Sequence, residues 1–126
     1  METHQPPSTV LVVEDEPILR ELSAYELEDA GYLVLEAGSA AEALDIMRSG
    51  RMVGILFTDV NMPGSMDGLQ LARMVNDLWP DVKLIVTSGA GRVRPCDVPD
   101  EGRFLAKPYS LSKLRETVDD LVGGHA

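Results

Sequence analysis

Segments with strand character and segments with the apolar period of a helix alternate along this chain almost five times, with short connections between them. Alternation of this kind is typical of a mostly parallel sheet that is covered by helices on both faces. The pattern therefore predicts a single α/β domain. The expected strands are 9–13, 32–37, 52–58, 82–87 and 104–106, and the expected helices are 17–30, 40–49, 69–79 and 111–122.

Local signals mark the ends of the first two helices. Pro17 suits the first turn of a helix, and Gly31 is a typical stop. Ser39 and Glu42 have the S-x-x-E spacing of a capping box, which predicts the start of the second helix. The apolar residues expected on one face of the first helix are Ile18, Leu22 and Tyr25.

One segment breaks the alternation, because a helix is due between the fourth and fifth strands. The chain there reads SGAGRVRPCDVPDEGR and contains several glycines and two prolines. Proline inside a helix costs about 3 kcal/mol and glycine about 1 kcal/mol relative to alanine. We expect this helix to be shortened to a turn or two, or to be missing.

The length of 126 residues suits one domain, which we expect to cover 9–122. Residues 1–8 form a disordered or loosely attached N-terminus in this interpretation, and 123–126 form a short tail. The start of the chain lacks a basic and apolar leader, and no stretch approaches the roughly 18 apolar residues that span a membrane. These features and the single cysteine predict that the protein is located in the cytoplasm.

The balance of charge narrows the classes of partner. Twenty-one acidic and eleven basic residues give a formal net charge of −10. Such a chain repels phosphate backbones and anionic lipid surfaces. We therefore expect no direct binding of nucleic acid or membranes, and look for a protein partner.

Polar and charged residues stand where the expected strands end. Ligands of parallel sheets bind beyond the carboxyl ends of the strands, so these residues are the candidate site. They are Glu14 and Asp15 after the first strand, Asp59 after the third, Thr87 and Ser88 after the fourth, and Lys107 with Pro108 after the fifth.

Their chemistry suits phosphoryl transfer. Two carboxylates about 4 Å apart repel each other by about 4 kcal/mol at an effective dielectric near 20, so counter-ions are needed. Lys107 can supply one positive charge, and a divalent cation can supply the rest. Oxygen ligands without histidine or cysteine favour Mg²⁺. A carboxylate beside a cation and a lysine can accept a phosphoryl group, which makes Asp59 a candidate phosphoacceptor.

Four motifs bear a resemblance to a known family: VLVVEDE, FTDVNMPGSMDGL, LIVTSG and FLAKPY, in this order between Val10 and Val122. Together they resemble the receiver domain of bacterial response regulators, the CheY-like family of two-component signalling. The resemblance implies a flavodoxin-like, doubly wound sheet of five parallel strands in the order 2-1-3-4-5.

The resemblance also implies roles for the acidic residues and the lysine. Asp59 would accept a phosphoryl group from a histidine kinase or a histidine phosphotransfer protein. Asp15 would bind Mg²⁺ together with Asp59 and the backbone carbonyl of Asn61, and Glu14 would help through water. Lys107 would pair first with Asp59 and later with the phosphate.

A second set of residues would respond to phosphorylation. Thr87 would be the switch hydroxyl, with Ser88 beside it, and the bond between Lys107 and Pro108 would be cis. Phe104 falls at the position of the family's switch aromatic, although a phenylalanine on a short strand serves core packing equally well. Partners of the family dock on the first helix, where the plausible contacts are Leu19, Leu22 and Ser23.

Two departures from the family pattern affect this interpretation. The loop after Asp59 reads MPGSMDG, with Gly64 and Ser65 where the family usually has one residue. The segment 89–102 resembles receivers of hybrid histidine kinases and of stand-alone regulators.

We expect the protein to be a monomer or weak dimer. The sequence does not identify its downstream partner.

Two other functions remain open. One is a degenerate receiver that binds its partner constitutively. The other is a hydrolase that turns over an external phosphoester through an aspartyl phosphate, but such chemistry usually needs an acid where this chain has Asn61. We therefore expect that the protein is not an enzyme. It would promote only its own Mg²⁺-dependent phosphorylation and dephosphorylation.

Overall fold

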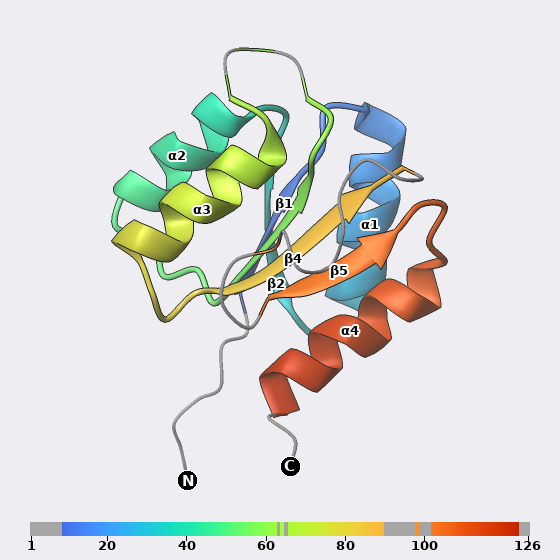
Figure 1. Cartoon of the computed structure of the whole chain (residues 1–126). Helices are drawn as coiled ribbons and strands as arrows, with labels where there is room; N and C mark the ends of the chain where they lie inside the picture. The colour runs from blue at the N-terminus through green and yellow to red at the C-terminus, as the bar shows by residue number, and fades with distance from the viewer. Residues whose placement is uncertain (1–8, 63, 65, 90–97, 99–101, 124–126) are drawn as a thin grey trace, which may run out of the picture.

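A computed structural model describes residues 9–62, 64, 66–89, 98 and 102–123. Five parallel strands form one sheet in the order β2-β1-β3-β4-β5, which confirms the predicted topology (Figure 1). The strands are β1 (Thr9–Val13), β2 (Leu33–Ala37), β3 (Ile55–Asp59), β4 (Lys83–Ser88) and β5 (Arg103–Ala106).

Four helices cover the sheet in the described part of the chain, two on each face (Figure 1). On one face lie α2 (Ala40–Arg48) and α3 (Gly68–Leu78), and on the other lie α1 (Pro17–Asp29) and α4 (Leu111–Gly123). Alternate residues of the central strands fill the two cores, as a sheet buried on both faces requires. The helix expected to be shortened or missing falls at 90–97 and 99–101, outside the described residues.

The predicted helix boundaries are mostly confirmed. Pro17 begins α1, and Gly31 follows it with a φ of 103°, a conformation that favours glycine. The Ser39 hydroxyl accepts a hydrogen bond from the Glu42 N–H and caps α2. The Glu42 carboxylate, however, accepts from the Gly38 N–H, so the reciprocal half of the predicted capping box is displaced by one residue.

The buried face of α1 differs from the apolar face in the sequence. Ile18, Leu22 and Tyr25 do lie on one face, but they are 71%, 49% and 69% exposed. The buried residues of α1 are Ser23, Ala24 and Leu27. Small side chains at two of these positions let the helix approach the sheet closely. The apolar face formed by Ile18, Leu22 and Tyr25 is therefore not the buried face of this helix.

The end of the last helix differs slightly from the predicted domain limit. The last helix continues through Gly123, which the sequence analysis placed in the tail. Residues 1–8 and 124–126 lie outside the described residues. Among the described helices, none is long and apolar enough to cross a membrane.

Candidate functional site

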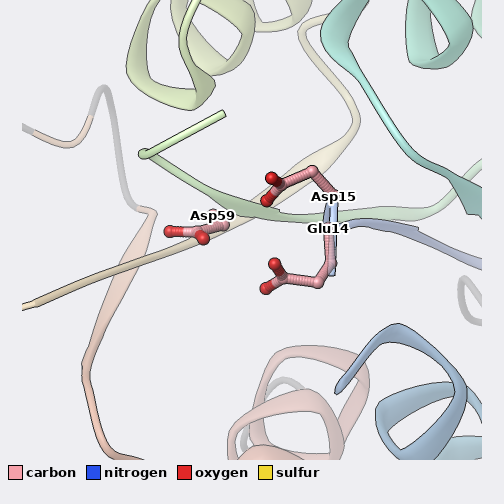
Figure 2. Close-up of side chains that lie close together, drawn as sticks. All are labelled: Glu14, Asp15 and Asp59. Carbon is pink, nitrogen blue, oxygen red and sulfur yellow. The ribbon is translucent and has the colours of Figure 1, made fainter. Parts of the chain in front are cut away.

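The carboxyl ends of β1 and β3 bring three acidic residues together. Val13 pairs with Thr58, so the residues that follow on each strand, Glu14 and Asp59, are neighbours. Glu14, Asp15 and Asp59 each offer one carboxylate oxygen, and these atoms lie within 4.8 Å of one another (Figure 2). Glu14 and Asp59 are buried, whereas Asp15 is exposed. The sequence analysis predicted this cluster.

The carboxylate of Asp59 is 3% exposed and has a partner for each oxygen. Its Oδ2 accepts a hydrogen bond from Lys107 Nζ at 2.8 Å, and its Oδ1 accepts one from the backbone N–H of Asn61 at 3.2 Å. A buried carboxylate is tolerated only when it is paired and hydrogen-bonded. These contacts explain how a charge can stand at the end of a buried strand.

Lys107 reaches two acids from the end of β5. Its Nζ also lies 3.7 Å from Glu14 Oε1, and its backbone N–H donates to the carbonyl of Ser88 at 2.9 Å. Burial lowers the pKa of Lys107, but the hydrogen bond and charge of Asp59 and the charge of Glu14 outweigh it, so the pKa is raised. The amine is therefore fully charged near neutral pH. The bond between Lys107 and Pro108 is cis, as predicted.

Glu14 sits in an environment that favours its protonated form. The pKa of Glu14 is raised to about 7, chiefly by burial and also by the charge of Asp59, although a hydrogen bond from the Glu16 N–H and the charge of Lys107 act to lower it. Glu14 is therefore partly protonated near neutral pH when no metal ion is bound.

The chemistry of the donors fits Mg²⁺. Three carboxylates supply hard oxygen ligands, and the exposed Asp15 leaves the cluster open to water. Mg²⁺ binds through a few carboxylates and keeps several waters, so this donor set suits it better than it suits a softer metal.

The residues expected to act as a switch lie beside the acids. Thr87 is the register partner of Asp59 on the neighbouring strand, and Thr87 and Ser88 are buried. Neither hydroxyl has a hydrogen-bond partner within the described part of the chain. Phe104 is half-buried and packs against the core under α2 and α3. The switch roles of these residues stay predictions.

Two residues at the site were missed in the sequence analysis. Gly68, the first residue of α3, lies so close to Asp59 that an added Cβ would stand 1.8 Å from the Asp59 backbone oxygen. Arg20 of α1 donates from Nη1 to the carbonyl of Glu14 at 2.8 Å, and its Nε contacts Glu36 Oε1 at 3.3 Å. Asp67 and Gln70 form a full capping box at the start of α3, and this spacing is the one sequence signal that could have located Gly68 at the first position of the helix.

The sequence model of the response regulator receiver domain matches residues 10–119. The chain belongs to this family. Receiver domains of two-component systems bind Mg²⁺ at an acidic pocket and work with histidine kinases or phosphotransfer proteins. The chain is therefore a receiver domain of two-component signalling, which confirms the resemblance and the function drawn from the motifs.

Curated relatives include both hybrid kinases and small regulators. The sensor kinase CckA of Brucella abortus is 41% identical over 119 residues, which are 91% of this chain and 12% of the kinase. The response regulator receiver protein CpdR of the same organism is 30% identical over 116 residues, which are 90% of this chain and 95% of CpdR. The chain thus spans a small part of one relative and nearly all of the other.

Solved structures share the fold over almost the whole chain. A response regulator receiver protein from Sinorhizobium medicae is 28% identical with a TM-score of 0.84, covering 93% of this chain and 95% of that one. The response regulator TrrA of Thermotoga maritima, solved in complex with Mg(2+)-BeF, is 30% identical with a TM-score of 0.79, covering 90% of this chain and 98% of TrrA.

Proposed function

We propose that Asp59 is the phosphoacceptor and takes its phosphoryl group from a phosphohistidine of a kinase or phosphotransfer protein. The observation that carries this proposal is the position of the Asp59 carboxylate. It is buried beside Glu14 and Asp15, and its Oδ2 is 2.8 Å from the Lys107 amine. This arrangement combines a nucleophile with a fixed positive charge, as phosphoryl transfer requires.

In the proposed reaction a carboxylate oxygen of Asp59 forms a bond to phosphorus while the bond from phosphorus to the donor imidazole nitrogen breaks. The imidazole leaves with the electron pair of that bond and takes a proton from water. Lys107 moves its hydrogen bond from Asp59 to a phosphoryl oxygen. Thr87 donates its hydroxyl to another phosphoryl oxygen, which gives this orphan buried group a partner.

We assign Mg²⁺ to Asp15, Asp59 and the backbone carbonyl of Asn61, with Glu14 acting through water. When bound, the ion supplies positive charge that offsets the phosphoryl oxygens. The residues of the chain hold the acids in place, since Arg20 donates to the Glu14 carbonyl and the Asn61 N–H donates to Asp59.

A cavity of about 430 Å³ is lined by Glu16, Leu19, Lys107, Pro108 and Tyr109, and Lys107 connects it to Asp59. Leu19 of α1 lines this cavity and Leu22, three residues later, is 49% exposed, which supports docking of the phosphodonor protein on this helix. Leu19 and Leu22 remain candidate contacts. Ser23 was wrong as a surface contact, because it is buried in α1.

The experiment is intact-mass analysis after incubation with Mg²⁺ and acetyl phosphate. The wild type should gain one phosphoryl group, and Asp59→Asn should gain none. Asp45→Asn, an exposed aspartate of α2, is the matched control and should label like the wild type. Label that persists on Asp59→Asn would exclude Asp59 as the acceptor.

We further propose that the domain acts on no external substrate and works in the cytoplasm through protein partners. The single cysteine suits a reducing compartment, and Asn61 is no general acid for a phosphoesterase. The complete cluster with its lysine argues against a degenerate receiver. Turnover of p-nitrophenyl phosphate that depends on Asp59 would contradict the proposal that the domain is not an enzyme.

A further inference from the structure

A hydrogen bond joins the segment after β5 to the interior of α1. The Tyr109 hydroxyl lies 3.1 Å from the hydroxyl of Ser23, and either atom can donate. Ser23 is 1% exposed, so water is not available to replace this bond on its side. A buried hydroxyl in a helix needs such a partner. The contact therefore selects one position for the Tyr109 side chain.

The ring of Tyr109 has a second contact. It meets the ring of Phe57 edge-on, with centroids 5.7 Å apart and an interplanar angle of 79°. Phe57 is buried in β3, on the strand that ends in Asp59. Edge-to-face pairs of this kind are favoured by the charge distribution of the rings. Tyr109 is thus held at its hydroxyl by α1 and at its ring by β3.

These contacts bear on Lys107, which stands two residues earlier. A lysine stem has many rotamers, so the position of its amine depends on how firmly the backbone is held. The Lys107 N–H donates to Ser88 of β4 on one side, and Tyr109 holds the chain on the other. The Lys107 side chain is 26% exposed, so water competes for the amine if that support is lost.

We propose that Tyr109 is a positioning residue for Lys107, and that its hydrogen bond with Ser23 keeps the Lys107 amine on Asp59 for phosphoryl transfer. The inference rests on the proposed function, because it assigns Lys107 to the phosphorylation site. Tyr109 acts through the backbone of 107–109. Loss of the hydrogen bond between Tyr109 and Ser23 should leave the three carboxylates of the site in place and loosen only the Lys107 amine.

The test measures the initial rate of phosphorylation by acetyl phosphate in excess Mg²⁺. Tyr109→Phe and Ser23→Ala each remove one hydroxyl of the same bond. Each should slow the reaction by about three- to tenfold, as expected for the loss of one hydrogen bond. The double variant should be no slower than the slower single variant, because both remove the same interaction.

A second readout separates positioning from general stability. The ammonium group of Lys107, observed by ¹H–¹⁵N NMR and assigned with Lys107→Arg, should give a protected signal in the wild type and lose it in both variants. Tyr32→Phe is the matched control, since the Tyr32 hydroxyl donates to Asp119 of α4, which is not part of the acidic cluster around Asp59. It should leave the phosphorylation rate and the Lys107 signal unchanged.

Several results would overturn the inference: a wild-type rate in either single variant, additive losses in the double variant, or equal slowing by Tyr32→Phe. If circular dichroism shows that one of the two single variants is unfolded, the rate of the other single variant tests the inference. Lys107→Met separates this inference from the proposed function. A normal rate in Lys107→Met removes Lys107 from the proposed mechanism. A slow Lys107→Met with normal Tyr109→Phe and Ser23→Ala defeats the positioning inference alone.

Discussion

The first residue of α3, Gly68, packs against the backbone carbonyl of Asp59. A Cβ at Gly68 would stand 1.8 Å from the Asp59 oxygen and 2.6 Å from its carbonyl carbon. Both atoms belong to the backbone and cannot turn away as a side chain would. A side chain at residue 68 can therefore be accommodated only if the end of β3 or the start of α3 shifts.

We expect Gly68→Ala to lower the free energy of unfolding by about 1–3 kcal/mol, the usual cost of overpacking. It should also slow phosphorylation of Asp59, because the backbone that carries the carboxylate must shift. Urea denaturation measures the first effect and intact mass the second. Gly123→Ala is the control, since an added Cβ there meets nothing within 4 Å. Equal stability of the two variants would contradict this account of the contact.

Removing the amine of Lys107 should have opposite effects on stability and on metal binding. Lys107→Met leaves Asp59 and Glu14 without their nearest cation, so the metal-free protein should unfold more easily by about 1–3 kcal/mol, less than for a fully buried pair. The same change should tighten Mg²⁺ binding, because a repelling charge is gone.

Mg²⁺ titration followed by calorimetry checks that prediction. Lys113→Met is the control, because the Lys113 side chain is 61% exposed and its amine lies 4.0 Å from Glu116 Oε1 in an ordinary surface pair. Weaker Mg²⁺ binding in Lys107→Met than in Lys113→Met would show that Lys107 holds the acids in place more than it opposes the ion.

The raised pKa of Glu14 predicts how stability changes with pH in the presence of a chelator. The pKa of Glu14 is about 7 in the fold and 4.5 as its ordinary value, so the folded protein takes up the proton first. The stabilising contribution of Glu14 is complete below the ordinary pKa and is lost as pH rises through the folded pKa.

Glu14→Gln lacks this titration. The variant should therefore gain stability relative to the wild type as the pH is raised from about 4.5 to about 8. Denaturation in urea with EDTA at several pH values measures the difference. Glu28→Gln, an exposed glutamate of α1, serves as the control. A difference between Glu14→Gln and the wild type that does not change with pH would mean that Glu14 ionises normally.

Two leucines of α1 should differ sharply in their contribution to stability. Leu27 is fully buried, so Leu27→Ala should cost about 2–5 kcal/mol. Leu22 is 49% exposed, and Leu22→Ala should cost less than about 1 kcal/mol while phosphorylation by acetyl phosphate stays normal. Chemical denaturation of both variants measures this. Similar losses for the two leucines would mean that the Leu22 face is covered.

Much of the fold could be read from local patterns. Short apolar segments identified the five strands, and Pro17, Gly31 and Ser39 marked helix ends, because caps and stops depend on neighbouring residues. The carboxyl ends of parallel strands share one edge of the sheet. That rule predicted that Glu14, Asp15, Asp59 and Lys107 lie at one edge, and the family resemblance added the strand order and the pairing of Lys107 with Asp59.

Other relationships were decided by the tertiary structure. The buried face of α1 carries Ser23, Ala24 and Leu27, whereas Leu22 is half exposed, because the orientation of the helix against the sheet decides which side chains are covered. Tyr109 finds Ser23 across 86 residues, and Gly68 meets the Asp59 carbonyl where a helix crosses a strand end. Such contacts depend on distances between packed elements. The sequence alone therefore determined which chemical groups gather at the sheet edge, and tertiary packing decided which residues hold them there.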